Sequence, residues 1–166
     1  MSVSIADKKY LHVVPDSIQI PEQFYLGSTK DIRGRTDYFN ARELEYEEVV
    51  APGRSDDRLL EIMSGMDLSR VGGIIFEYPI YPRTLKIIKK NYPETRLLVR
   101  AHHAEFYQRL HYFAARAKYV YGWRRFKGHL VMARDIPRRL RQDYSCARLA
   151  DGVLSITSWE IDNYWK

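Results

Sequence analysis

Short apolar runs alternate with helical patterns along this chain. Each run is nearly continuous and rich in β-branched residues, which is typical of strands covered on both faces, as in parallel sheets. The runs predicted as strands are residues 11–15, 46–50, 73–77, 96–100 and 152–156. Their alternation with helices predicts an α/β fold with a doubly wound, mainly parallel sheet in a three-layer sandwich with right-handed crossovers, built as a single domain.

Apolar residues at helical spacing lie between these runs. The predicted helices are residues 36–44, 55–63, 81–90, 104 to about 121, and a further helix beginning near residue 135. Ser55 is a good N-cap for the second of them, and Pro93 follows the end of the third. In the last helix we expect Leu140, Tyr144 and Ala147 to face inward. Residues 122–134 keep no clean period and contain two glycines, which predicts a connection there.

Composition narrows the class of protein. The 166 residues have room for one domain with a real core. The single cysteine, Cys146, excludes an internal disulfide and a cysteine-based zinc site, and so favours a reducing, cytoplasmic setting. The first residues do not resemble a secretory signal, and no apolar run approaches the roughly 18 residues that span a bilayer.

Basic residues are concentrated in one region. The net charge is +6, and residues 106–149 carry eleven Lys or Arg against two Asp, interleaved with Tyr, Trp and Phe. Such a region is either a solvated helical face or a surface for an anionic membrane or a polyphosphate. The residues expected to bind a membrane or an anion are Arg116, Lys118, Arg124, Arg125, Lys127, Arg138 and Arg139.

Ionisable residues follow the fourth predicted strand, in the segment from Leu97 to Glu105. The carboxyl ends of parallel strands face the ligand crevice, so polar side chains placed there are candidates for chemistry. His102 and His103 are consecutive and point in different directions, so we expect no metal site. The alternative is that either histidine is a hydrogen-bonded structural group and that Glu105 is a helix N-terminal charge. Arg100, within an apolar strand, needs a partner.

The first strand is followed by a long loop that ends in Gly27-Ser28 and continues to Arg33. Small residues there let backbone N–H groups approach a phosphate at the next helix N-terminus, although a surface turn explains them equally. The chain contains neither G-x-G-x-x-G nor G-x-x-x-x-G-K-[ST], which argues against a nicotinamide dehydrogenase and a P-loop NTPase. The last strand runs into a helix capped by Thr157 or Ser158.

These features occur in a particular succession. Residues 100–105 read Arg-Ala-His-His-Ala-Glu, a basic helical stretch follows, and residues 150–160 read Ala-Asp-Gly-Val-Leu-Ser-Ile-Thr-Ser-Trp-Glu. The succession resembles the N-terminal domain of GT-B glycosyltransferases in the large retaining group called family 4 (glycosyl transferases group 1). Members show an R-x-H-N-x-E-like pattern after the fourth strand and an A-D-x-V-like strand before a short helix with Ser and Glu. The resemblance implies a Rossmann-like fold.

The resemblance also implies roles for individual residues. His102 matches the family histidine that contacts the transferred sugar or the acceptor, and His103 stands where Asn is more usual. Arg100 and Glu105 match positions that orient the histidine loop. Ser158, in the short helix, is a further expected substrate-binding residue.

Gly27, Ser28 and Arg33 match the glycine loop that helps to bind donor phosphate or acceptor in the family. Ser28 replaces the second glycine of that loop. In GT-B enzymes the nucleotide-sugar donor is bound mainly by a second, C-terminal domain, and we expect residues 1–166 to lack it, either as an excised domain or beside a partner chain. The expected partners are therefore a nucleotide-sugar co-substrate and a glycan or lipid-linked acceptor, with no cofactor and no specific nucleic acid.

Three functions follow from the sequence. The first is the acceptor-binding domain of a retaining glycosyltransferase in polysaccharide or glycoconjugate synthesis, peripheral on the inner face of the cell membrane. The second is a non-catalytic α/β module whose basic helices bind nucleic acid or an anionic membrane. The third, a flavodoxin-like or response-regulator-like domain, is disfavoured because no acidic pair follows the first strand.

Overall fold

The computed structural model describes residues 9–20, 27–102, 105–117 and 123–165. Five strands form one sheet in the order β2-β1-β3-β4-β5, and every neighbouring pair is parallel. All five strands predicted from the sequence are confirmed, with ends shifted by two residues at most. They are β1 (Lys9–Pro15), β2 (Tyr46–Ala51), β3 (Val71–Glu77), β4 (Arg96–Ala101) and β5 (Gly152–Ser155).

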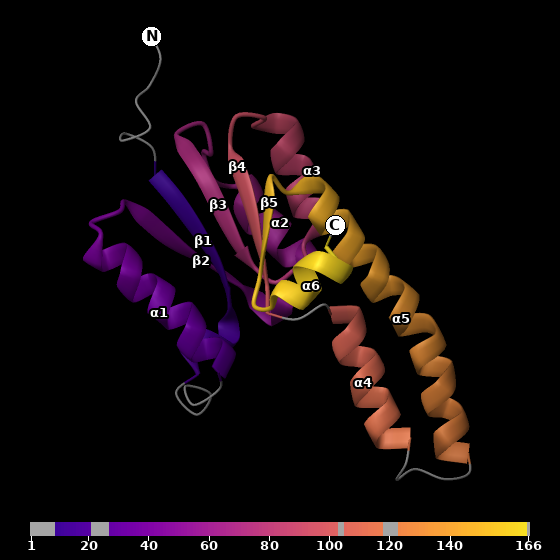
Figure 1. Ribbon diagram of the computed structural model, residues 1–166. Coiled ribbons are helices and arrows are strands. Elements are labelled where there is room, and N and C mark those ends of the chain that lie inside the picture. Colours follow the sequence, from indigo (N-terminus) through magenta and orange to yellow (C-terminus); the bar gives the residue numbers. More distant parts are fainter. Residues whose placement is uncertain (1–8, 21–26, 103–104, 118–122, 166) are drawn as a thin grey trace.

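Helices cover both faces of this sheet (Figure 1). In chain order they are α1 (Gly27–Ala41), α2 (Asp56–Ser64), α3 (Pro82–Asn91), α4 (Glu105–Ala117), α5 (Trp123–Leu149) and α6 (Ser158–Asn163), with short 3₁₀ turns η2 (Asp16–Gln19) and η4 (Pro52–Arg54). The helix α1 lies on one face, and α2, α3 and the C-terminal part of α5 lie on the other. The fold is thus a Rossmann-like three-layer sandwich, with its topological switch point between β1 and β3.

The two faces of the sheet differ in polarity. Towards α2 and α3, alternate strand residues such as Val13 and Phe76 form a large apolar core with Leu85 of α3. Towards α1 the apolar cluster is small and is built from Val14, Ile18 and Ile32. The face under α1 therefore leaves room for buried polar side chains.

The prediction for the first helix was wrong at its start. The helix α1 begins at Gly27 rather than at residue 36. The residues predicted to end the loop after the first strand therefore form the first half of α1. Ile32 is buried against the sheet, and Asp31 pairs with Arg35 one turn later at 3.2 Å. These tertiary contacts outweigh the low helix propensity of the two glycines in this stretch.

The prediction that residues 122–134 form a connection was also wrong, because α5 runs without a break from Trp123 to Leu149. Phe113 of α4 meets the ring of His129 edge-on at 4.9 Å, and a Cβ on Gly128 would lie 3.7 Å from Phe113. Packing against α4 thus stabilises this half of α5. Leu140 and Tyr144, expected to face inward, are 44% and 65% exposed.

The helices α4 and α5 form an antiparallel hairpin that extends beyond the edge of the sheet (Figure 1). On the inner side of the C-terminal half of α5, Asp143 and Cys146 are fully buried. Asp143 accepts hydrogen bonds from the backbone N–H of Phe106 at 3.2 Å and from the hydroxyl of Tyr164 at 2.7 Å. In the described part of the chain, none of the helices combines the length and apolarity needed to cross a membrane.

Candidate ligand site at the carboxyl edge of the sheet

A buried carboxylate lies at the end of β3. Both oxygens of Glu77 accept hydrogen bonds: His12 Nε2 donates at 2.7 Å, His102 Nε2 at 3.0 Å, and Arg35 donates through Nε and Nη2, each at 2.7 Å. Burial alone would raise the pKa of Glu77, but the hydrogen bonds from His102, His12 and Arg35 outweigh burial and hold it well below its usual range. Glu77 is therefore ionised, and both histidines donate to it.

A second carboxylate, that of Asp31 on α1, extends this network towards solvent. Arg100 Nη2 donates to Asp31 Oδ2 at 2.6 Å, and Arg35 lies 3.2 Å from the same oxygen. The Nδ1 atom of His102 is 3.6 Å away. Two carboxylates thus face two guanidinium groups, and their charges balance. The Asp31 side chain is 37% exposed, so it is the carboxylate of the pair that a ligand can reach.

Strand alternation explains why these residues meet. Glu77 and Arg100 are register partners on neighbouring strands, so their side chains project from the same face. His12 projects from β1 on that face as well, and His102 follows the end of β4. Asp31 and Arg35 are one turn apart on α1, the helix that covers this face. The fold therefore brings side chains from four elements to one point.

A ring stack links the network to the switch point between β1 and β3. The ring of His102 packs on Tyr78 with centroids 4.8 Å apart, and the guanidinium carbon of Arg54 lies 4.2 Å from the centre of the Tyr78 ring. Tyr78 and Arg54 have positive φ angles, 135° and 50°, and so does Gly53. Non-glycine residues in such conformations cost roughly 1–3 kcal/mol each and cluster at functional sites.

The site combines buried and accessible groups. Glu77, His12 and His102 are buried, and His102 is only 3% exposed. Asp31 and Arg54 form the accessible rim, with one hydrogen-bond acceptor and one cation. This combination suits a ligand with hydroxyl or anionic groups. Within the described ranges, no group of three or more His, Cys, Asp or Glu is placed so that it could hold a metal ion.

Of the site residues expected from the sequence, Arg100 and His102 belong to this network. Arg33 is exposed on α1. Gly27 and Ser28 lie in the first turn of α1, and Glu105 begins α4, but the structure does not describe the surroundings of these three residues. His103 lies outside the described residues.

Ser158 is the first residue of α6 and is exposed. The cap of that helix is Thr157, whose side chain accepts a hydrogen bond from the backbone N–H of Glu160 at 3.2 Å. Glu160 also accepts a hydrogen bond from the hydroxyl of Ser155 at 2.5 Å. This junction lies beyond the end of β5.

The residues expected to bind a membrane or an anion fall into three groups. Lys127 and Arg138 are exposed on α5. Arg139 lies 3.7 Å from Asp135, which also faces Arg109 of α4, so it belongs to the packed side of the hairpin. For the remaining members the side chains lie outside the described residues: Arg116, Lys118, Arg124 and Arg125.

Sequence reasoning missed His12, Glu77, Asp31 and Arg54 and did not place Arg35 in this network. The criterion that selected Arg100, an ionisable residue within an apolar strand, applies equally to His12, which lies between Leu11 and Val13, and to Glu77 at the end of an apolar run. Applied to every predicted strand, it would have found half of the network. The residues of α1 were hidden because the start of that helix was misplaced.

Fold and site together define a Rossmann-like α/β protein with a buried ionic network at the carboxyl edge of its sheet. Comparison of the chain with protein-family models, curated proteins and solved structures gives no significant match.

Proposed function

We propose that this chain is the acceptor-binding domain of a retaining glycosyltransferase, which transfers a sugar from a nucleotide-sugar donor to a glycan or lipid-linked acceptor. One observation carries the proposal. His102 and Arg100, the residues that match the family pattern, share a network with Asp31 and Glu77 at the edge of the sheet where ligands of this fold class bind. A sheet of this type is also the fold that the resemblance implies.

In this proposal Asp31 binds the acceptor, and the buried His102 lies directly behind it. A hydroxyl that donates to Asp31 Oδ2 comes next to His102 Nδ1, because 3.6 Å separates these two atoms. Glu77 accepts a hydrogen bond from the other ring nitrogen of His102 and so sets the orientation of the imidazole. Arg100 and Arg35 hold the Asp31 carboxylate in place. Glu77, Arg100 and Arg35 are therefore positioning residues.

The reaction replaces the nucleoside diphosphate on the sugar carbon by the acceptor oxygen, with retention of configuration. Charge develops on the leaving phosphate, and its stabilisation is electrostatic. In the family this falls to the donor-binding domain, so the residues described here serve the acceptor side. The proposed location is the cytoplasm, with no cofactor beyond the nucleotide-sugar co-substrate.

Binding of the chain to an array of immobilised oligosaccharides and glycolipids tests this proposal. We expect a defined subset of glycans to bind, and both Asp31→Asn and His102→Gln to weaken that binding by about tenfold or more, the cost of losing a polar contact in a ligand site. Asp37→Asn is the matched control because Asp37 is exposed on the same helix. Urea unfolding verifies that each variant folds.

Two results would contradict the proposal. One is the absence of glycan binding by the folded chain. The other is glycan binding that survives both Asp31→Asn and His102→Gln. The competing function, a non-catalytic module that binds a polyanion, is favoured by the exposed cations of α5. It predicts binding to heparin without glycan selectivity and no effect of either substitution.

A further inference from the structure

The outer side of α5 carries a row of cations that the network around Glu77 does not use. The cations of this row are seven, four, three and seven residues apart in sequence. These separations place them on one side of a helix with 3.6 residues per turn. At a rise of about 1.5 Å per residue the row is roughly 32 Å long. It consists of Lys127, Arg134, Arg138, Arg141 and Arg148, and every one is exposed. We call it the α5 basic row.

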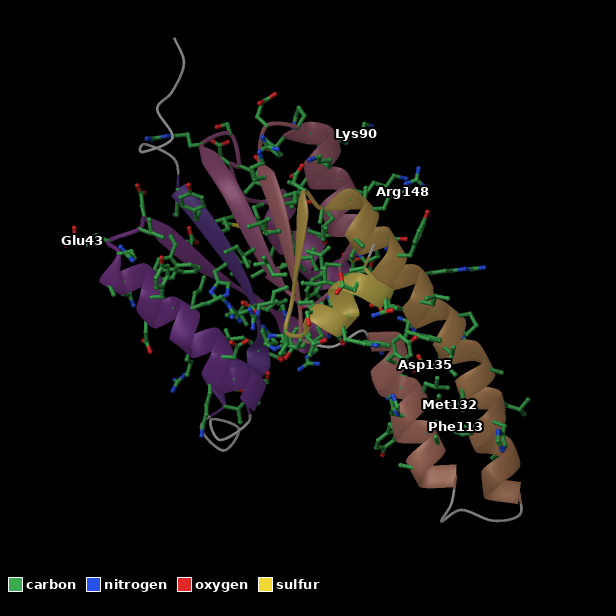
Figure 2. All side chains as sticks on the ribbon, viewed as in Figure 1. Glu43, Lys90, Phe113, Met132, Asp135 and Arg148 are labelled. Atoms are coloured by element: carbon green, nitrogen blue, oxygen red, sulfur yellow. The ribbon has the colours of Figure 1, made fainter. Side chains whose placement is uncertain are left out.

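The acidic residues of α5 face α4 and the body of the protein. Asp135 pairs with Arg109 of α4 at 3.5 Å, and Asp143 is buried beneath α6 and the start of α4. Figure 2 shows Phe113, Met132 and Asp135 along the side where α4 and α5 face each other, while Arg148 points away from the body of the protein. Within the described part of the chain, the four arginines of the row form no ion pair. The four arginines thus present a surface of one sign.

Apolar side chains interrupt the α5 basic row. Leu130 and Val131 lie between its first two members and are 57% and 65% exposed, and Tyr144 lies between its last two. A polyphosphate such as RNA would pair with the cations but leave Leu130 and Val131 in water. A bilayer surface accommodates both kinds of group, because cations bind lipid phosphates, aliphatic side chains enter the acyl boundary and tyrosine lies at headgroup level.

We propose that the α5 basic row is the surface through which this protein docks on an anionic lipid membrane. The position of the hairpin favours this, since α4 and α5 extend beyond the sheet and the N-terminal half of α5 is clear of it (Figure 1). This docking is independent of sugar transfer and places the protein body beside the bilayer without a spanning helix. The α5 basic row also differs from the set of residues expected from the sequence. It excludes Arg139, and it adds Arg134, Arg141 and Arg148.

Cosedimentation of the 166-residue chain with vesicles tests the proposal. We expect binding to phosphatidylcholine vesicles that contain phosphatidylglycerol and none to phosphatidylcholine alone. The triple variant Arg134→Gln, Arg138→Gln, Arg141→Gln should lower the partition coefficient on the order of 100-fold, since each cation contributes roughly fivefold near an anionic surface. The matched control removes three exposed cations elsewhere, in Arg70→Gln, Lys86→Gln, Lys90→Gln, and should change binding about threefold at most.

The double variant Leu130→Ser, Val131→Ser separates a membrane from a soluble polyanion. Membrane docking predicts a loss of about tenfold in vesicle binding with heparin binding unchanged. A soluble polyanion predicts another pattern: the triple variant loses vesicle and heparin binding equally, and the double variant is unaffected. That result would assign the row to a nucleic acid or another polyanion and overturn the proposal. So would vesicle binding that survives the triple variant. Circular dichroism and urea unfolding confirm that each variant is folded, and no arm depends on glycan binding.

Discussion

Removing the charge of Glu77 is the sharpest test of the network. Glu77→Gln preserves shape but turns an acceptor-only carboxylate into an amide, whose NH₂ group then faces donors from histidine or arginine. It also leaves the mostly buried guanidinium of Arg35 without its strongest partner. Removing one member of a buried ion pair typically costs about 3–5 kcal/mol. Because the amide oxygen still accepts hydrogen bonds, we expect the lower figure, about 3 kcal/mol at neutral pH.

The dependence on pH gives the reasoning a second check. The pKa of Glu77 is far lower in the folded protein than its ordinary value of 4.5. Its contribution to the free energy of unfolding is therefore complete above that value and is lost as the pH falls towards the folded pKa. The stability difference between the wild type and Glu77→Gln should be constant at neutral pH and should shrink progressively in acid.

Urea unfolding followed by circular dichroism measures both quantities. The control is Glu47→Gln, which removes an exposed carboxylate on β2 that pairs with Lys9 and should cost under about 1 kcal/mol. If Glu77→Gln costs no more than this control, the network does not stabilise the fold as argued. If the difference from the wild type stays constant into acid, the reason given for the depressed pKa is wrong.

Two further predictions concern the helices. Asp56 caps α3 from outside, because its carboxylate accepts hydrogen bonds from the backbone N–H groups of Arg83 and Thr84 at 2.8 and 3.0 Å. Asp56→Ala should therefore lower the free energy of unfolding by about 2–3 kcal/mol. The control Asp57→Ala, which changes the exposed neighbour, should lower it by less than about 0.5 kcal/mol. Equal losses in the two variants would refute this cap. Pro137 lies inside α5 and is exposed. Pro137→Ala should restore a backbone N–H and raise the free energy of unfolding by about 1–3 kcal/mol, which is seen as a higher urea midpoint. An unchanged or lower midpoint would show that the proline is not a defect in the helix.

The strands were predictable because their evidence is local. Each buried strand is an apolar run flanked by turn residues, and no tertiary contact is needed to recognise it. The caps at Ser55 and at Thr157, one of two residues proposed for that position, were also readable, because an N-cap interacts within its own first turn. The resulting alternation of strands and helices was enough for the fold class.

The errors arose where tertiary packing overrides local preference. Gly34 and Gly128 have low helix propensity and so argue against a helix at their positions. Burial of Ile32 nevertheless stabilises α1, which contains Gly34, and packing of Phe113 beside Gly128 stabilises α5. The sequence predicted a helix start near residue 135, which lies within α5. The site was half predictable for a related reason: ionisable residues in apolar strands are visible in the sequence, whereas their partners on α1 depend on how that helix docks.

The attachment of α1 connects the stability of the fold to the candidate site. Ile32 is a fully buried apolar contact of this helix, and its links to the sheet include the pairs from Arg35 to Glu77 and from Asp31 to Arg100. The acidic group that a ligand can reach, Asp31, is therefore also one of the groups that hold the helix. A hydroxyl bound to Asp31 in the folded protein adds to this network and stabilises the docked helix against unfolding. Ligand binding at this edge and the docking of α1 are thus thermodynamically linked.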